Sequence, residues 1–158
     1  LPVGPQAGNS SVDDTFLLGS GTKPYTAAAI MRLVDQGKLT LNDKVSQHVD
    51  GPMQSMWNTT FVELMGKNAT NVTVGNLLRM QAGIGDFDVP SYDDQTLATG
   101  DKVHSPLEIL KTVASFNETY GCKTYNCTFT CEPGTCTMYS STNFLIAGLV
   151  LLGNAPEG

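Results

Sequence analysis

A serine and a lysine stand three residues apart at the start of an apolar helical pattern. Ser20 and Lys23 precede residues 27–34, which are rich in alanine and branched apolar side chains, and Gly37 follows as a helix stop. The pattern predicts a helix over residues 20–36. Residues three apart lie on one face of a helix, so the lysine can reach the serine hydroxyl. A free serine hydroxyl is a weak nucleophile, and an adjacent amine is one way to activate it.

The pair alone is a weak signal. S-x-x-K arises by chance in many chains of this length, and a capping serine beside a solvated lysine is an alternative interpretation. The start of a helix also offers backbone N–H groups and a partial positive charge, which would stabilise an oxyanion formed at Ser20. The rest of the sequence must therefore decide between a structural and a catalytic interpretation.

Charge and hydropathy narrow the classes of partner. The chain has 158 residues with nine Lys and Arg against fifteen Asp and Glu, a net charge of −6, and no basic cluster. Nucleic-acid binding depends on basic surface, so we expect no nucleic-acid partner. The longest apolar run, residues 144–152, is nine residues long. That is too short to span a bilayer, so we expect a buried helix and no membrane span.

Glycosylation sequons are unusually frequent. Six of the ten asparagines begin an N-x-[ST] triplet, namely Asn9, Asn58, Asn68, Asn71, Asn117 and Asn126. The alternative is a threonine-rich chain with fortuitous sequons. We expect glycosylation of a secreted or lumenal protein, either extracellular or in a lysosome or vacuole. The first residues do not form a signal peptide, so we expect any leader to lie upstream.

The four cysteines, Cys122, Cys127, Cys131 and Cys136, lie within fifteen residues. Structural zinc sites commonly use C-x2-C pairs, and the spacing here is wider, so we expect no metal. Together with the sequons, the cluster favours an oxidising compartment and two disulfides. Three pairings are open. We favour the nested one, with Cys122–Cys136 enclosing Cys127–Cys131.

Three further helices are predicted after the first one. Residues 74–81 follow Thr73 as a plausible N-cap, and Gly83 is the stop. Residues 106–116 begin with proline, and residues 142–152 are apolar throughout.

Three segments between these helices read as loops. Residues 1–15 are rich in Gly, Pro and Ser and predict an N-terminal loop or arm. Residues 50–71 hold three sequons and predict an exposed glycosylated insertion. Residues 85–105 contain Asp86 and several further aspartates without a calcium-loop pattern, and they predict a solvated acidic loop.

Four blocks in order, residues 15–27, 35–45, 72–84 and 132–144, resemble the serine β-lactamase-related family. This family comprises class C β-lactamases, D-Ala-D-Ala carboxypeptidases (penicillin-binding enzymes) and related esterases. The first block resembles the nucleophile motif and the second resembles the turn after the nucleophile helix. The third resembles the short helix ending in Ser-Gly-Leu, and the fourth resembles the Pro-Gly plus Tyr-x-Asn motif. Because four blocks occur in the family's order over most of the chain, the match is specific.

The resemblance implies roles for four residues. Ser20 matches the acyl-forming nucleophile, and Lys23 matches the lysine that tunes it. Tyr139 matches the tyrosine that exchanges a proton with the nucleophile and the leaving group. A tyrosine beside a lysine ammonium can have a lowered pKa, which makes its phenolate a usable base. Ser141 stands where the family usually has a substrate-binding asparagine, and its hydroxyl supplies fewer donors than an amide.

A second departure from the family is the missing third motif, Lys-Thr-Gly or His-x-Gly on a strand at the sheet edge. The resemblance implies an α+β fold of the β-lactamase/transpeptidase type, about twice as long as this chain. We therefore expect residues 16–158 to be a partial domain, mainly the helical subdomain, with the sheet largely missing and with the disulfide patch at residues 122–136. The remainder of the domain, in a second chain or in further sequence, is then an expected partner.

The function implied is that of a secreted serine hydrolase with a Ser/Lys/Tyr site and an acyl-enzyme intermediate. Its substrate would be a small acyl or peptide compound with an amide, ester or lactam, and no cofactor is expected. Activity is expected only when the rest of the domain is present. The alternative is a catalytically inactive relative that serves as a structural or binding module in an extracellular assembly, which Ser141 and the missing motif favour.

Overall fold

Helices dominate the chain. The computed structural model describes residues 11, 13–100, 102–116, 118–119 and 127–155. In these residues the α-helices are α1 (Lys23–Asp35), α2 (Ser46–Trp57), α3 (Phe61–Met65), α4 (Val74–Leu78), α5 (Pro90–Thr99), α6 (Pro106–Ala114) and α7 (Ser141–Gly153). The 3-10 helices η2 (Gly19–Thr22) and η3 (Lys67–Asn71) precede α1 and α4.

Strands make up little of the described residues. β1 (Glu118–Thr119) and β2 (Cys127–Phe129) pair in parallel as a two-stranded sheet. This agrees with the expectation of a mainly helical part of a larger fold. The extended sheet that the α+β family fold requires is not formed by the described residues.

Helix starts follow the local sequence closely. The Thr73 hydroxyl accepts a hydrogen bond from the backbone N–H of Asn76, and the Asn76 side chain accepts one from the backbone of Thr73. Ser105 and Glu108 form the same reciprocal arrangement at the start of α6. These capping boxes satisfy N–H groups that the first helical turn leaves free, which explains why both starts were predicted correctly from the sequence.

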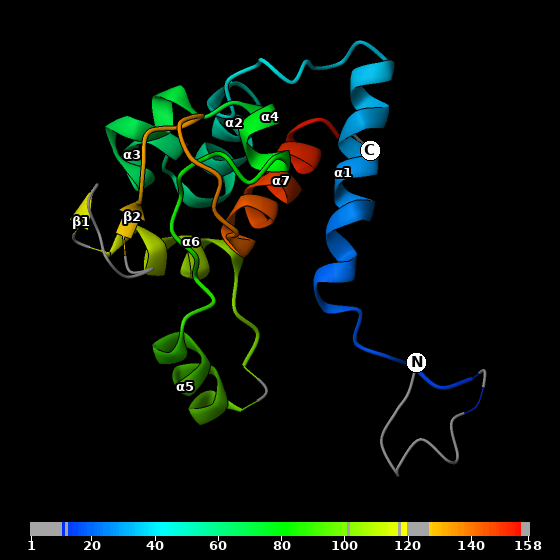
Figure 1. Ribbon diagram of the computed structural model, residues 1–158, viewed down its shortest axis with the longest axis vertical. Coiled ribbons are helices and arrows are strands. Elements are labelled where there is room, and N and C mark those ends of the chain that lie inside the picture. The colour runs from blue at the N-terminus through cyan, green and yellow to red at the C-terminus, as the bar shows by residue number, and fades with distance from the viewer. Residues whose placement is uncertain (1–10, 12, 101, 117, 120–126, 156–158) are drawn as a thin grey trace.

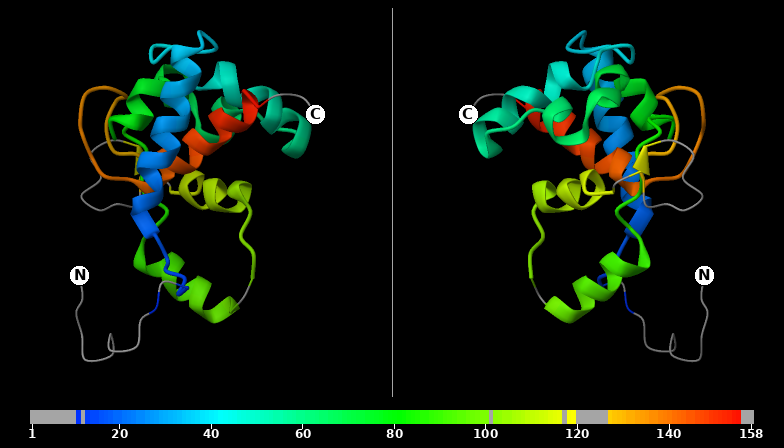
Figure 2. Two further views of the ribbon diagram at one scale, coloured as in Figure 1. Left: turned by 90° about the vertical axis from the view of Figure 1, so that its right-hand side faces the viewer. Right: turned by 90° about the vertical axis from the view of Figure 1, so that its left-hand side faces the viewer.

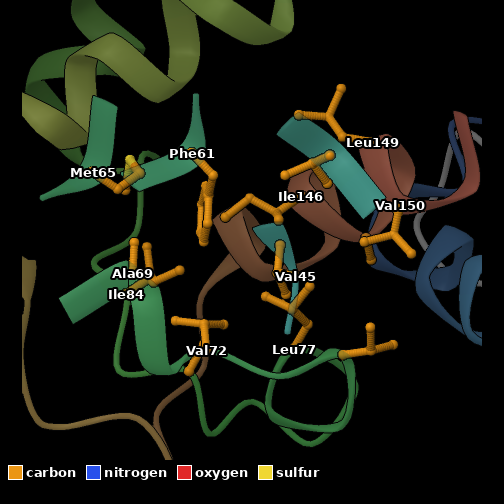
Figure 3. Close-up of a cluster of buried hydrophobic side chains, with 14 of the residues drawn as sticks. Val45, Phe61, Met65, Ala69, Val72, Leu77, Ile84, Ile146, Leu149 and Val150 are labelled. Atoms are coloured by element: carbon orange, nitrogen blue, oxygen red, sulfur yellow. The ribbon is translucent and has the colours of Figure 1, made fainter. Parts of the chain in front are cut away.

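The core is built around α7, which contacts α1, α2 and α4. Figure 3 shows side chains of α7 pointing into a cluster with residues from α3, α4 and the segment before α2. The labelled members are Val45, Phe61, Met65, Ala69, Val72, Leu77, Ile84, Ile146, Leu149 and Val150, all of them buried. The apolar run near the end of the chain is therefore a buried helix, as predicted.

Helix α1 lies along one side of the molecule and packs on α7 (Figures 1 and 2). Ile30 is its one fully buried residue. Large apolar side chains before and on it are exposed, namely Phe16, Leu17, Leu18, Tyr25 and Met31. α1 and the segment before it therefore leave several large apolar side chains uncovered.

The prediction of an exposed insertion at residues 50–71 is wrong. This segment forms most of α2, all of α3 and η3, and it buries Met53, Phe61, Met65 and Ala69. Pro52 lies inside α2 and suggested a loop. Burial of apolar side chains outweighs the weak helix propensity of such a segment.

The prediction of a solvated loop at residues 85–105 also needs correction. Residues Pro90–Thr99 form α5, with a proline in its first turn. The rings of Tyr92 and Phe87 pack edge to face with their centres 5.4 Å apart, and the centres of the His104 and Tyr92 rings are 5.7 Å apart. These aromatic contacts anchor an arm that Figure 1 shows extending away from the other helices.

The nested disulfide pairing is wrong as well. Cys131 pairs with Cys136, five residues away. Cys127 is also disulfide-bonded, and Cys122 lies outside the described residues. The turn at Pro133 and Gly134 brings Cys131 and Cys136 within disulfide distance, with their Cα atoms 6.3 Å apart.

Candidate active site

Ser20 and Lys23 meet where η2 runs into α1. The ammonium of Lys23 donates a hydrogen bond to Ser20 Oγ at 3.0 Å. The serine lies in the single 3-10 turn, and the lysine is the first residue of the α-helix. This continuous helical path places both side chains on one face, as their spacing predicts.

Tyr139 reaches the same point from a distant part of the sequence. Its hydroxyl lies 2.5 Å from Ser20 Oγ, and either oxygen can be the donor. Tyr139 stands two residues before α7, and α7 packs against α1. The packing of these two helices therefore brings the tyrosine to the serine.

Ser141 completes the group. Lys23 donates a second hydrogen bond to Ser141 Oγ at 3.3 Å. The lysine nitrogen also lies 4.9 Å from the centre of the Tyr139 ring and 6.0 Å from that of Phe144. One ammonium thus bridges the serine on η2 and the first residue of α7.

The environment favours the ionised form of Tyr139. The pKa of its hydroxyl is lowered from the ordinary tyrosine value. The hydrogen bond from Lys23 is the largest cause, followed by that with Ser20, while partial desolvation acts in the opposite direction. A lowered pKa makes the phenolate easier to form, and the phenolate can accept a proton from the neighbouring serine.

The group is open on one side. Ser20 is exposed and Tyr139 is 53% exposed, while Lys23 is half-buried behind them. Leu17 and Leu18, just before the serine, are exposed too. A carbonyl compound can therefore approach Ser20 from this side.

Asp86 is hydrogen-bonded to Ser141 of this group, and sequence reasoning missed it. The residue is 7% exposed, and its carboxylate accepts hydrogen bonds from the backbone N–H groups of Ser141 at 3.0 Å and Asp88 at 3.3 Å. Burial raises the pKa of its carboxyl, and the backbone N–H groups and the charge of Lys23 oppose that rise. We had placed Asp86 in a solvated acidic loop, and its neighbours in sequence gave no sign that it is buried.

Two further hydrogen bonds join the same segments. Ser140 Oγ donates to the carbonyl of Gly85 at 3.1 Å, and the backbone N–H of Phe87 donates to Thr142 Oγ1 at 3.1 Å. Residues 85–87 and 140–142, which we call the clasp, are thus joined at three successive positions. The clasp fixes the start of α7, and with it Ser141 and the approach to Tyr139.

The chemistry available here is that of a nucleophilic hydroxyl, a phenol able to take its proton and an ammonium that stabilises the phenolate. Sequence motifs suggested the family, and a direct comparison decides it. The Beta-lactamase family model matches residues 5–155. This chain belongs to the Beta-lactamase family.

Individual relatives of this Beta-lactamase family chain are longer proteins. Penicillin-binding protein 4 of Amycolatopsis lactamdurans is 30% identical over 142 residues, which cover 89% of this chain and 30% of that protein. Protein flp of Staphylococcus aureus (strain NCTC 8325 / PS 47) is 38% identical over 81 residues, which cover 51% of this chain and 14% of that protein. The chain thus spans less than a third of the length of these relatives. No solved structure matches it.

Other predicted sites of this Beta-lactamase family chain can be placed in part. The sequon asparagines Asn58 and Asn71 are exposed and Asn68 is half-buried. Asn9, Asn117 and Asn126 lie outside the described residues. Among the residues that the structure describes, no group of His, Cys, Asp or Glu could hold a metal ion, and no helix is long and apolar enough to cross a membrane.

Proposed function

We propose that the complete protein is a serine hydrolase that forms an acyl-enzyme at Ser20 with an amide, an ester or a lactam. The observation that carries the proposal is the position of Ser20 Oγ, 2.5 Å from the Tyr139 hydroxyl and 3.0 Å from the Lys23 ammonium. Membership of the Beta-lactamase family supports this class of chemistry. The chain covers only part of its relatives, so the activity is proposed for the whole protein.

In acylation, the Tyr139 phenolate takes the proton of Ser20 while the bond between Ser20 Oγ and the substrate carbonyl carbon forms. The hydrogen bond from Lys23 to Ser20 and the lowered pKa of Tyr139 both support this step. Tyr139 then passes the proton to the leaving nitrogen or oxygen as its bond to the carbonyl carbon breaks. In deacylation, Tyr139 accepts a proton from the water that attacks the acyl carbonyl carbon. It returns this proton to Ser20 Oγ as the bond between Oγ and that carbon breaks.

Ser141 is proposed to bind the substrate. Its hydroxyl receives a hydrogen bond from Lys23, so one of its lone pairs is occupied, and its own proton remains available for a substrate carbonyl. A hydroxyl offers one hydrogen-bond donor where an amide would offer two. We therefore expect weaker or altered binding of the substrate at this position.

The remainder of the domain, in a second chain or in further sequence, is proposed to complete the site. A tetrahedral oxyanion needs hydrogen-bond donors on more than one side. The family's third motif, Lys-Thr-Gly or His-x-Gly on a strand, does not occur in this sequence. The exposed apolar side chains of α1 and the segment before it support a covering element on this side.

A covalent probe tests the proposal. Full-length protein is incubated with a fluorophosphonate or with a fluorescent penicillin, and the modified peptide is identified by mass spectrometry. We expect one label at Ser20, lost in Ser20→Ala and retained in Ser55→Ala, which alters an exposed serine on α2. Folded wild-type protein that takes up neither probe contradicts the proposal.

We further propose that the protein is glycosylated and passes through the secretory pathway. The exposed positions of Asn58 and Asn71 support this, because both side chains are accessible for glycan transfer. Expression in a secreting eukaryotic host should give protein that loses mass on treatment with an N-glycosidase. Asn58→Gln and Asn71→Gln should each remove one glycan, and secreted protein of unmodified mass contradicts the proposal.

A further inference from the structure

Asp86 is a buried residue that hydrogen bonds link to the proposed nucleophile group. Its carboxylate accepts a hydrogen bond from the backbone N–H of Ser141, and Ser141 Oγ accepts one from Lys23. A chain of two short contacts therefore links a buried negative charge to the ammonium beside Ser20. Buried carboxylates are costly unless paired, so their presence beside a functional group calls for an explanation.

We propose that Asp86 is a positioning residue of this site. Its carboxylate fixes the start of α7 so that the Ser141 hydroxyl and Tyr139 face Lys23. This inference rests on the proposed function for its catalytic consequence, and its structural part can be tested separately.

The geometry of the clasp supports this role. The clasp joins residues 85–87 to 140–142 at three successive positions, and Asp86 forms the middle link. Ser140 is the N-cap residue of α7, but its side chain makes no cap hydrogen bond with its own helix. Asp86 supplies the acceptor for the first N–H of the helix instead, with a negative charge at the end where the helix dipole favours it.

Isosteric substitution tests the hydrogen bonds of Asp86. Asp86→Asn keeps an oxygen that can accept from the backbone N–H groups of Ser141 and Asp88, whereas Asp86→Ala removes it. Asp43→Ala is the matched control, because Asp43 also accepts hydrogen bonds from a backbone N–H and a hydroxyl but takes no part in the clasp. All variants are made in the full-length protein.

The first readout does not depend on activity. Hydrogen–deuterium exchange, followed by mass spectrometry, reports how well the backbone N–H groups at the start of α7 are protected. We expect the exchange there to be about tenfold or more faster in Asp86→Ala and close to wild type in Asp86→Asn and Asp43→Ala. Unchanged exchange in Asp86→Ala overturns the positioning role.

The second readout is the rate of acylation by fluorescent penicillin or fluorophosphonate. Asp86→Ala should lower this rate, and Asp86→Asn, which keeps the acceptor, should restore most of it. A wild-type rate in Asp86→Ala overturns the catalytic consequence. If wild-type protein is not acylated but the start of α7 exchanges faster in Asp86→Ala, the proposed function fails while the role of Asp86 stands.

Discussion

Ser20 Oγ and the Tyr139 hydroxyl lie 2.5 Å apart although 119 residues separate them in the sequence. One side chain comes from the turn before α1 and the other from the segment before α7. They meet because α1 packs on α7 and because the clasp fixes where α7 begins. The proposed site therefore depends on helix packing as much as on the local serine and lysine motif.

Tyr139→Phe should lower the rate of acylation by about a hundredfold to ten-thousandfold, because it removes the proton acceptor beside Ser20. The ring and its packing remain, so the fold should not change. Tyr25→Phe is the control, since Tyr25 is exposed on the same helix as Lys23. Stopped-flow experiments with fluorescent penicillin measure the acylation rates of both variants. Equal rates for wild type and Tyr139→Phe contradict the role of the phenol.

The lowered pKa of Tyr139 predicts how acylation depends on pH. The rate should rise with pH as the phenolate forms, and this rise should occur below the pH at which free tyrosine ionises, about 10. Because the hydrogen bond from Lys23 is the largest cause of the lowered pKa, Lys23→Met should move the rise to higher pH. Lys38→Met, on the exposed turn after α1, should leave the profile unchanged. A profile that Lys23→Met does not shift contradicts this assignment.

The sequence predicted those parts of the molecule that depend on local interactions. Ser20 and Lys23 are one helical turn apart, and the start of α4 follows from the capping box at Thr73, so neither needs the rest of the fold. The position of Tyr139 came only from the resemblance to a family, because no local rule joins residues 119 apart.

Burial decided what the sequence could not. Asp86 was grouped with exposed aspartates because composition alone does not tell which carboxylate a neighbouring segment covers. Residues 50–71 were predicted as an exposed insertion because sequons and a proline indicate loops, yet Met53 and Phe61 are buried in the core. The disulfide pairing depended on chain path, since four cysteines allow three pairings.

Asp43 should make stability depend on pH. Hydrogen bonds from the hydroxyl and the backbone N–H of Thr40 lower the pKa of the Asp43 carboxyl, and His48 contributes further. A carboxyl with a lowered pKa stabilises the folded state above its unfolded-state pKa, and this stabilisation is lost as pH falls through the folded-state pKa. Asp43→Asn should therefore lower the free energy of unfolding by about 1 kcal/mol at neutral pH.

Urea unfolding at neutral pH and near pH 3 checks this prediction. The difference between wild type and Asp43→Asn should shrink in acid, because both side chains are then uncharged. Asp86 should behave in the opposite way. Its pKa is raised by burial, so wild type should gain stability relative to Asp86→Asn as pH falls through that raised pKa. If the difference in the free energy of unfolding between wild type and an Asn variant does not vary with pH, it contradicts the direction of the pKa shift assigned to that aspartate.

Gly83 should not tolerate a side chain. Its φ is +71°, a left-handed conformation that costs other residues about 1–2 kcal/mol, and a Cβ there would collide with the carbonyl oxygen of Cys131. The close approach belongs to the pairing of two segments, in which the backbone N–H of Thr130 donates to the carbonyl of Gly83 at 2.7 Å and that of Gly134 donates to Gln81 at 2.8 Å. Gly83→Ala should therefore separate the disulfide loop from the end of α4.

The expected cost of Gly83→Ala is at least about 2 kcal/mol in the free energy of unfolding, measured by urea denaturation. Gly51→Ala is the matched control. Gly51 lies inside α2 with nothing within 4 Å of an added Cβ, so alanine there should stabilise the helix by about 0.5–1 kcal/mol. Because Met138 is hydrogen-bonded to Met80 in the same pairing, Gly83→Ala should also displace Tyr139 and slow acylation. Equal stability of the two alanine variants contradicts the close packing of Gly83 against Cys131.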